Sequence, residues 1–527
     1  MNHNSQSKIP VIDLFAGPGG LAEGFSSLLT EANPVFRIGL SVEKDTYAHK
    51  TLELRSFFRQ FPRGQAPDEY YAYLRKEITR ENLFEIYPTE AEAARKEAWC
   101  AELGSPDFPS EQVDGRIEKA LAGSRKWVLI GGPPCQAYST VGRSRNKGKE
   151  GYVAEDDKRH FLYREYLRII ARHWPSVFVM ENVKGLLSAK VNGSNIFDHI
   201  LEDLHDPVSA LQNIQHGTTT GYKYRIFSLT KPASYPIQDS HSDFSPTDFL
   251  IMCEKYGIPQ ARHRLILIGV REDAGDIPPA TLVPNEQINA DEVLDGLPKL
   301  RSGLSREEDT YENWEERISH LIDGALFDSV YDKKENDVWD EIGTAFANLE
   351  VTKANGRGGE FLPLNARSRY REDWFVDPRL KGVCNHTTKS HMPSDLHRYL
   401  FASCFALVHG RSPTLPDFPK KLWPEHKNAH KALRSGNFSD RFRVQMASKA
   451  ATTIMSHIAK DGHYYIHYDP AQCRSLTVRE AARVQTFPDN YFFEGNKTQQ
   501  YTQVGNAVPP LLALQIASIV NELLIRI

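Results

Sequence analysis

Cysteine is scarce in this chain, with only six among 527 residues. No two of them form a Cys-x-x-Cys pair, and six cysteines scattered over such a length do not look like a disulfide framework. They are Cys100, Cys135, Cys253, Cys384, Cys404 and Cys473. This scarcity favours a reducing, intracellular setting.

Long apolar runs and an excess of charge are also missing. No apolar stretch approaches the ~20 residues that a membrane helix needs, and residues 1–10 lack the apolar segment of a secretory signal. We therefore expect a soluble protein with no membrane partner. The net charge is only −4, so a basic surface can come only from an uneven distribution of charge. The length predicts two or three domains.

The stretch around Cys135 is the most informative. Trp127 to Ile130 form an apolar run that is long enough for a buried strand and too short for a helix. Gly131-Gly132-Pro133-Pro134 then ends the strand, because proline removes a donor and fixes φ. A lone cysteine is usually a small buried hydrophobe. Here Cys135 follows a strand on a stiffened turn, which a core cysteine would not need.

A second strand ends in a carboxylate. Residues 176–180 read as another buried strand, followed by Glu181-Asn182-Val183. Ligands of open α/β sheets bind in the crevice outside the carboxyl ends of the strands. If the two strands are neighbours, Glu181 lies in the same crevice as Cys135.

The N-terminal part has the pattern of a nucleotide cradle. A strand over 11–15 is followed by the glycine turn 16–20 and then by a helical pattern, so the backbone can approach a ligand closely. A second strand, 35–42, ends at Glu43, which suits the two ribose hydroxyls of an adenosine-containing cofactor. A glycine turn without a ligand and a solvated surface carboxylate remain the alternatives.

Basic residues gather in three places. Arg143, Arg145 and Lys147 lie in a glycine-rich loop after Cys135 that suits closure over phosphates, or is simply a solvated loop. Arg262 and Arg264 alternate along one predicted strand face, so both could point into the crevice, although surface cations are the default. The third place is the run Arg367, Arg369 and Arg371.

Charge is segregated in the region after residue 275. Residues 281–350 hold 6 Lys+Arg against 18 Asp+Glu, whereas residues 351–450 hold 18 against 8. A surface that faces phosphates can be built from the second segment and hardly from the first. His386, His391 and His397 match no spacing of a zinc site, and we expect no metal.

Six motifs, in order along the chain, resemble the DNA cytosine-5 methyltransferase family. Besides the glycine turn, the Pro-Pro-Cys turn and Glu-Asn-Val, they include residues 260–264, 474–480 and 503–509. The resemblance implies an α/β, Rossmann-like fold of S-adenosylmethionine-dependent methyltransferases: a doubly wound mixed sheet with a second, smaller target-recognition domain. It implies a catalytic domain over 1–274 with an insertion at about 54–124, target recognition over 275–440, and a return to the catalytic domain over 441–527.

The resemblance also implies a reaction and its residues. Cys135 would attack carbon 6 of a flipped-out cytosine, with Glu181 at ring nitrogen 3, Arg264 near the carbonyl oxygen and Arg262 near the loop and phosphate. Asn182 would brace the turn before Cys135. The implied contacts to S-adenosylmethionine are Phe15, Gly17, Gly19, Gly20, Glu43, Pro134, Asn506 and Val508. The residue that contacts the cofactor adenine has no clean counterpart, and Glu102 is only a guess.

Double-stranded DNA is the partner that the resemblance implies, bound in part by the three basic groups above. We expect a cytoplasmic, prokaryotic monomer, nucleoid-associated when bound to DNA, with a restriction-modification or defence role and separately acting partner proteins. The alternatives are an RNA cytosine-5 methyltransferase on the same scaffold, a catalytically silent DNA-binding regulator, and a dinucleotide oxidoreductase suggested only by the glycine turn.

Overall fold

The computed structural model describes residues 8–134, 159–191, 194–212, 221–236, 245–275, 277–425 and 440–527. Contacts divide the chain into two compact units, and each is described by itself. Unit 1 comprises residues 1–66, 84–286 and 507–527, and unit 2 comprises residues 67–83 and 287–506. These bounds differ from the predicted domains, since residues 67–83 and 441–506 pack with unit 2.

Unit 1 is built on a nine-stranded mixed sheet with the order β11-β10-β14-β7-β6-β1-β4-β5, with β12 paired to β14. The five strands from β7 to β5 are parallel, and β14 runs antiparallel to β7. The strands are β1 (Ile9–Leu14), β4 (Phe36–Glu43), β5 (Ala98–Cys100), β6 (Val128–Gly131), β7 (Val177–Val183), β10 (Tyr224–Phe227), β11 (Ser234–Tyr235), β12 (Leu250–Met252) and β14 (His263–Arg271).

The chain winds outward twice from the middle of this sheet. It first goes from β1 to β4 and β5, then crosses back to β6 and β7 on the other side of β1. Because crossovers between parallel strands are right-handed, the helices of the two halves cover opposite faces. The helices are α1 (Gly20–Ser26), α2 (Thr46–Arg59), α5 (Pro88–Glu97), α6 (Ser110–Leu121), α8 (Arg159–His173), α9 (Ile196–His205), α10 (Pro207–Gln212) and α20 (Pro510–Arg526).

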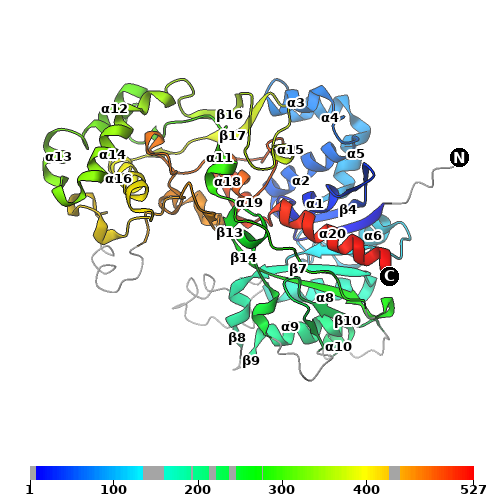
Figure 1. Ribbon diagram of the computed structural model, residues 1–527. Coiled ribbons are helices and arrows are strands. Elements are labelled where there is room, and N and C mark those ends of the chain that lie inside the picture. The colour runs from blue at the N-terminus through cyan, green and yellow to red at the C-terminus, as the bar shows by residue number, and fades with distance from the viewer. Residues whose placement is uncertain are drawn as a thin grey trace. The chain divides into compact units, whose positions relative to one another are not determined.

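The core of unit 1 explains why these strands read as apolar runs. Ile12 and Leu14 of β1 are buried against Ile117 of α6 and Tyr166 of α8. Strands buried on both faces have no alternating polar positions. Helices α8, α9 and α10 lie together beside β7 and β10 in Figure 1. The predicted doubly wound mixed sheet is confirmed.

The last helix, α20, is a core helix. Within the described residues, the helical stretch 497–526 is long enough to cross a membrane and contains an 18-residue window with a mean hydropathy of 1.7. However, 67% of that window is buried inside the protein. A Cβ added at Gly24 of α1 would lie 2.4 Å from the Cβ of Ala513 in α20. The apolar character of α20 therefore reflects its tight packing against α1.

Unit 2 is mainly helical. Helices α12, α14 and α16 pack around a core that contains Trp314, Trp339 and Phe401 (Figure 1). A two-stranded sheet pairs β16 with β17. The main elements are α3 (Asp68–Leu74), α11 (Ala290–Leu294), α12 (Tyr311–Ser319), α13 (Gly324–Val330), α14 (Asn336–Ala347), β16 (Gly358–Pro363), α15 (Glu372–Phe375), β17 (Gly382–Thr387), α16 (Pro393–His409), α18 (Val478–Val484) and α19 (Lys497–Asn506). The division between the units at residues 83 and 84 falls within α4 (Arg80–Ile86).

Candidate functional site

Three strand ends meet at one edge of the unit 1 sheet. Strands β1, β6 and β7 are parallel neighbours, with Leu14 opposite Gly131 and Gly131 opposite Met180. The chain leaves β1 on one side and β6 on the other, which makes this edge a topological switch point, where open α/β sheets bind ligands. The predicted neighbourhood of the strand before Cys135 and the strand of Glu181 is confirmed.

The turn after β1 is open to a ligand at Gly17. Phe15, Gly17 and Gly19 all have positive φ, at 58°, 57° and 93°. This left-handed conformation suits glycine and strains Phe15. A Cβ at Gly17 would meet no atom within 4 Å. Phe15 packs partly buried against the core, so its ring lies beside a turn with free space over its backbone.

The carboxylate of Glu43 is fixed to this turn. Its Oε2 accepts a hydrogen bond from the Gly17 N–H at 2.8 Å, and its Oε1 accepts one from the Asp45 N–H at 2.7 Å. Burial raises the pKa of Glu43, while hydrogen bonds from the backbone N–H groups of Asp45, Gly17 and Lys44 oppose the rise. The two carboxylate oxygens have about four lone-pair sites between them, so Glu43 can still accept a further hydrogen bond beside the glycine turn.

Gly20 is needed for packing. A Cβ at this position would lie 2.1 Å from the carbonyl oxygen of Val508. The backbone of Val508, which precedes α20, therefore lies directly against the first residue of α1, and the contact of Val508 with a cofactor stays a prediction. Asn506 is the exposed last residue of α19 and belongs to unit 2; its contact with a cofactor stays a prediction.

The Pro-Pro turn after β6 is tied to β7. Asn182 donates from Nδ2 to the carbonyl oxygen of Pro133 at 3.2 Å, and its Oδ1 accepts from the Val183 N–H at 2.9 Å. Pro134 is half-buried at the end of the described turn, and Cys135 lies outside the described residues. The structure thus has the hydrogen bond by which Asn182 was expected to brace the turn.

Glu181 faces this turn and is paired with Arg264. A Cβ at Gly132 would be 3.0 Å from both Oε2 and the backbone oxygen of Glu181, so a side chain at this position would press on the carboxylate. Nε of Arg264 lies 2.8 Å from Oε1 of Glu181, and Nη1 of Arg264 donates to the His263 carbonyl at 2.9 Å. The carboxylate and the guanidinium therefore form one charged pair at the carboxyl end of β7.

Arg262 was expected to lie on the same strand as Arg264, but it lies outside that strand. It lies between β13 (Gln260–Ala261) and β14, and only 1% of it is exposed. Its N–H donates to the Gln260 carbonyl, and its own carbonyl accepts from the Cys253 N–H. The break between the two strands interrupts the simple alternation. Burial raises the pKa of the Cys253 thiol, and the positive charges of both Arg262 and Arg264 oppose the rise, so both side chains lie near Cys253.

Asp13 is a buried carboxyl that the sequence analysis did not single out. It is fully buried in β1, and neither of its oxygens has a hydrogen-bond partner in the described part of the chain. Burial raises its pKa well above the ordinary value, although the positive charge of Arg59 opposes the rise. The sequence signal for this buried carboxyl was an acidic residue inside the apolar run 11–15.

The predicted DNA contacts fall into two groups. Arg143, Arg145 and Lys147 lie outside the described residues. The run Arg367, Arg369 and Arg371 is exposed in unit 2, but two of its members already have carboxylate partners. Arg369 contacts Asp291 at 2.8 Å and Asp295 at 3.1 Å.

Arg371 forms two 3.0 Å hydrogen bonds with Asp373. No ion pair to Arg367 is found among the described residues. Arg367 is therefore the member of the run best able to contact a phosphate.

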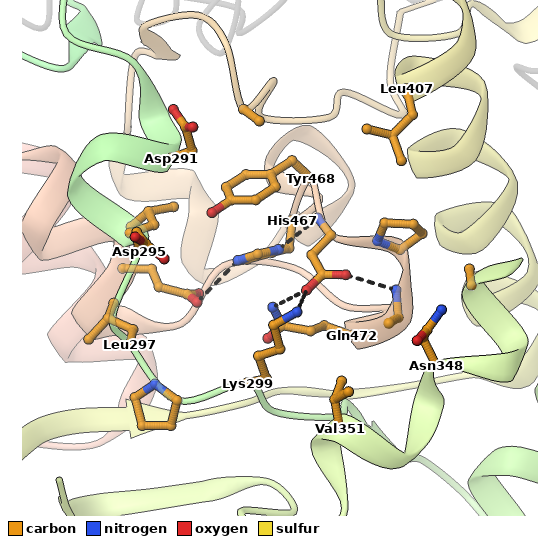
Figure 2. Close-up of a pocket in the computed structure, with 18 of the residues that line it drawn as sticks. Asp291, Asp295, Leu297, Lys299, Asn348, Val351, Leu407, His467, Tyr468 and Gln472 are labelled. Carbon is orange, nitrogen blue, oxygen red and sulfur yellow. Dashed lines mark hydrogen bonds and ion pairs between the residues drawn. The ribbon is translucent and has the colours of Figure 1, made fainter. Parts of the chain in front are cut away.

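Unit 2 also contains an acidic hollow of about 550 Å³ (Figure 2). Arg369 is one of its lining residues. Its charged lining consists of five carboxylates and two cations: Asp291, Asp295, Glu341, Asp469 and Glu480 against Lys299 and Arg369. Lys299 is bound to Asp469 at 3.0 Å. The excess of negative charge makes this hollow an unfavourable place for a phosphate.

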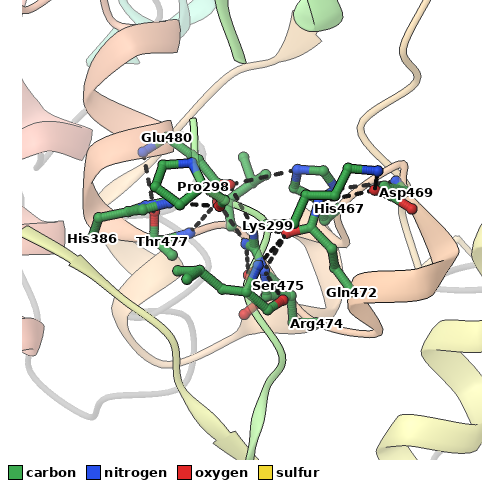
Figure 3. A network of polar contacts seen from close by, with 12 residues as sticks. Pro298, Lys299, His386, His467, Asp469, Gln472, Arg474, Ser475, Thr477 and Glu480 are labelled. Carbon is green, nitrogen blue, oxygen red and sulfur yellow. Dashed lines mark hydrogen bonds and ion pairs between the residues drawn. The ribbon is translucent and has the colours of Figure 1, made fainter. Parts of the chain in front are cut away.

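The motif at residues 474–480 forms a buried network in unit 2 (Figure 3). Arg474 makes two hydrogen bonds with Glu480, at 2.6 and 2.7 Å. Although burial opposes it, the Arg474 guanidinium holds the pKa of Glu480 well below its usual value. Thr477 and Glu480 form a capping box at the start of α18. This motif thus stabilises the fold of unit 2.

The three histidines considered for a metal have separate roles. His386 contacts Thr477 Oγ1 at 2.8 Å and the Pro298 carbonyl at 3.1 Å, and burial lowers its pKa to about 4. Burial lowers the pKa of His391 to about 3. His397 contacts the Arg317 carbonyl at 2.7 Å. Each ring therefore serves as a neutral hydrogen-bonding group in the core.

Comparison with known proteins places these observations in a family. The family model described as C-5 cytosine-specific DNA methylase matches residues 92–207 and 243–522. A type II methyltransferase of Bacillus paralicheniformis, M.Bpa9945I, is 33% identical over 98% of this chain and 99% of that protein.

Two further relatives are similar over most of their lengths. The type II methyltransferase M.DdeI of Desulfomicrobium norvegicum is 24% identical over 96% of this chain and 87% of that protein. The DNA (cytosine-5-)-methyltransferase M.ApeKI of Aeropyrum pernix is 29% identical, covering 77% of this chain and 83% of that protein. The similarity to these relatives extends over both units.

Proposed function

Because the chain belongs to the family of C-5 cytosine-specific DNA methylases, and so to the DNA (cytosine-5-)-methyltransferases, we propose that it methylates carbon 5 of a flipped-out cytosine in a specific duplex sequence. The methyl group comes from S-adenosylmethionine, and the reaction passes through a covalent adduct of the base with Cys135. The observation that carries this proposal is the Glu181–Arg264 pair beside the Gly-Pro-Pro turn that leads to Cys135.

The glycine turn and Glu43 fit the cofactor. Gly17 leaves free space over the backbone, and both oxygens of Glu43 are oriented by N–H groups while lone pairs remain for the ribose hydroxyls. We assign Phe15, a partly buried aromatic residue of the same turn, and Val508, whose backbone packs against Gly20, to the same cofactor site. S-adenosylmethionine supplies an electrophilic methyl group on a sulfonium.

The protein's residues activate the cytosine. The Cys135 thiolate would add to carbon 6 of the ring, and the electron pair displaced toward carbon 5 would make that carbon nucleophilic. Bound S-adenosylmethionine would supply the methyl group, with its sulfonium sulfur leaving as the neutral thioether. Glu181 shares a proton with ring nitrogen 3, which offsets the charge that accumulates there and is worth roughly 10²–10⁴ in rate. Arg264 holds the Glu181 carboxylate in place and reaches the base carbonyl. A base then removes the proton from carbon 5, and the thiolate leaves carbon 6.

Base flipping costs a few kcal/mol, and contacts to DNA outside the flipped base offset this cost. We assign such contacts to the loop with Arg143, Arg145 and Lys147 and to the exposed Arg367, with smaller contributions from the paired Arg369 and Arg371. Base-edge contacts from unit 2 would select the sequence.

Substitution of the nucleophile tests the covalent step. In C135A, methyl transfer should be abolished while duplex binding persists, because the thiolate acts on the base and not on the DNA backbone. Radioactive methyl transfer and a gel-shift measurement on one preparation report the two properties. Turnover by C135A would rule out this role for Cys135.

We further propose a modification role that protects DNA against a cognate endonuclease. Bisulfite sequencing of DNA from cells that express the protein should show one methylated sequence context, and purified DNA of that host should resist an endonuclease that cuts there. Methyl transfer to RNA but not to duplex DNA would instead identify the RNA-modifying alternative.

A further inference from the structure

A second hollow in unit 2, of about 250 Å³, has the opposite charge to the acidic one. Three cations line it, together with polar and apolar residues, and none of the described residues in its lining is an aspartate or a glutamate. The cations are Arg411, Arg443 and Lys449, and the polar residues are Ser412, Gln445 and Thr452. The two hollows adjoin along the chain, since Met446 lines the basic one and the next residue, Ala447, lines the acidic one.

The two arginines of this basic hollow are held in place by carboxylates outside its lining. Arg411 forms two hydrogen bonds with Asp417, at 2.8 and 2.9 Å, and its guanidinium lies 4.8 Å from the centre of the Phe405 ring. Arg443 is paired with Asp440. Their charges are therefore largely balanced, and they serve as fixed walls of the hollow.

Lys449 is different, because its charge is not balanced. Its Nζ donates to the Gly410 carbonyl at 3.1 Å, and no carboxylate lies within ion-pair distance among the residues that the structure describes. An ammonium has three N–H donors, so at least one remains for a ligand. The side chain is exposed at the rim of the hollow.

The polar side chains of the hollow are engaged within the protein. Gln445 accepts from the N–H of Thr452 at 2.9 Å and donates to the Tyr464 carbonyl at 2.8 Å. Ser412 exchanges hydrogen bonds with the backbone of Val444. Groups that are already satisfied cannot read the edge of a base without losing these bonds, whereas the ammonium of Lys449 is available to an anion.

We propose that this basic hollow, through Lys449, binds a backbone phosphate of the DNA duplex and thereby positions unit 2 on DNA without reading its sequence. The inference rests on the proposed function for the identity of the DNA. The ammonium of lysine is a compact point charge that suits a single phosphate group. The negative charge of the adjoining acidic hollow disfavours a phosphate on that side. Contacts of this kind fix the register and orientation of a protein on the duplex.

The test is the salt dependence of duplex binding. Each phosphate contact contributes about 0.9 to the slope of log K against log [salt]. Fluorescence anisotropy with a labelled duplex at several NaCl concentrations should give K449Q a slope that is smaller by about 0.9, with equal loss of affinity for different sequences. K449R, which keeps the charge, should retain the wild-type slope.

Two controls make the result decisive. K334Q removes an exposed lysine from the acidic segment 281–350 and should leave the slope unchanged, which separates a local contact from the effect of net charge. Inorganic phosphate should displace the duplex no better than NaCl of the same ionic strength; specific displacement would assign the hollow to free phosphate instead. An unchanged slope in K449Q, or a loss for one sequence only, would overturn the proposal. Because binding needs no turnover, these outcomes are independent of whether the wild type methylates DNA.

Discussion

The hydrogen bond from Asn182 to the Pro133 carbonyl offers the sharpest test of how the fold positions Cys135. The Gly-Pro-Pro turn cannot hold itself through proline N–H groups, because proline has none. Asn182, which is 4% exposed, supplies the donor from β7 at 3.2 Å and also accepts from the Val183 N–H. The substitution N182A removes both hydrogen bonds and leaves Cys135 and the turn before it unchanged in sequence.

The size of the effect follows from these two bonds. A hydrogen bond contributes a net ~0.5–1.5 kcal/mol, and a buried polar group left without a partner costs ~1–3 kcal/mol. We therefore expect the active geometry of the turn to lose about 1–2 kcal/mol, a factor of roughly 5–30 in its population. The maximal rate of methyl transfer should fall by this factor, because the thiolate is less often in position.

The assay is single-turnover methyl transfer at saturating DNA and S-adenosylmethionine, with duplex affinity measured on the same samples. Affinity for DNA should change little, since Asn182 is buried. N33A, at an exposed asparagine with one 3.3 Å hydrogen bond to the Glu31 carbonyl, is the matched control and should keep the wild-type rate. A wild-type rate in N182A would refute the view that β7 holds the turn.

Three further predictions concern packing, pH and DNA. G20A should lower stability by about 1–3 kcal/mol, whereas G115A, where a Cβ meets nothing within 4 Å, should not destabilise; thermal unfolding measures both. The raised pKa of folded Asp13 means that the folded state keeps a proton which the unfolded chain releases, so this group's contribution to stability falls as pH rises from about 4 through the folded pKa. D13N should remove this fall in stability. If urea unfolding shows the same change in free energy of unfolding with pH for D13N and the wild type, the reasoning is wrong. R367Q should weaken duplex binding and flatten its salt dependence more than R371Q, because Asp373 already pairs with Arg371; equal effects would show that the pairing does not matter.

The sequence by itself determined the strands, the turns and their order. Largely apolar runs of four to eight residues followed by glycine, proline or a carboxylate are local patterns, and they predicted β1, β4, β6 and β7 to within a few residues. The capping box at Thr477 was equally readable, because both of its hydrogen bonds span three residues. The motifs likewise carried the family resemblance that the comparisons confirm.

Only the tertiary structure decided which charges are buried and which are balanced. Arg474, Arg479 and Arg483 belong to what reads as a basic, helix-forming stretch, yet all three are buried, with carboxylate or backbone partners. Arg369 is paired with Asp291, 78 residues away. Such pairings depend on which segments the fold brings together, so no local pattern reveals them.

The same distinction applies to the site. Strand order brings Glu181 beside the turn at Gly132 and joins it to Arg264, while Arg262 lies buried between two strands. The sequence identified the chemical groups, because residue types and their local spacing can be read directly from it. Their distances, their burial and the open ammonium of Lys449 arise from long-range packing, which is a property of the folded molecule.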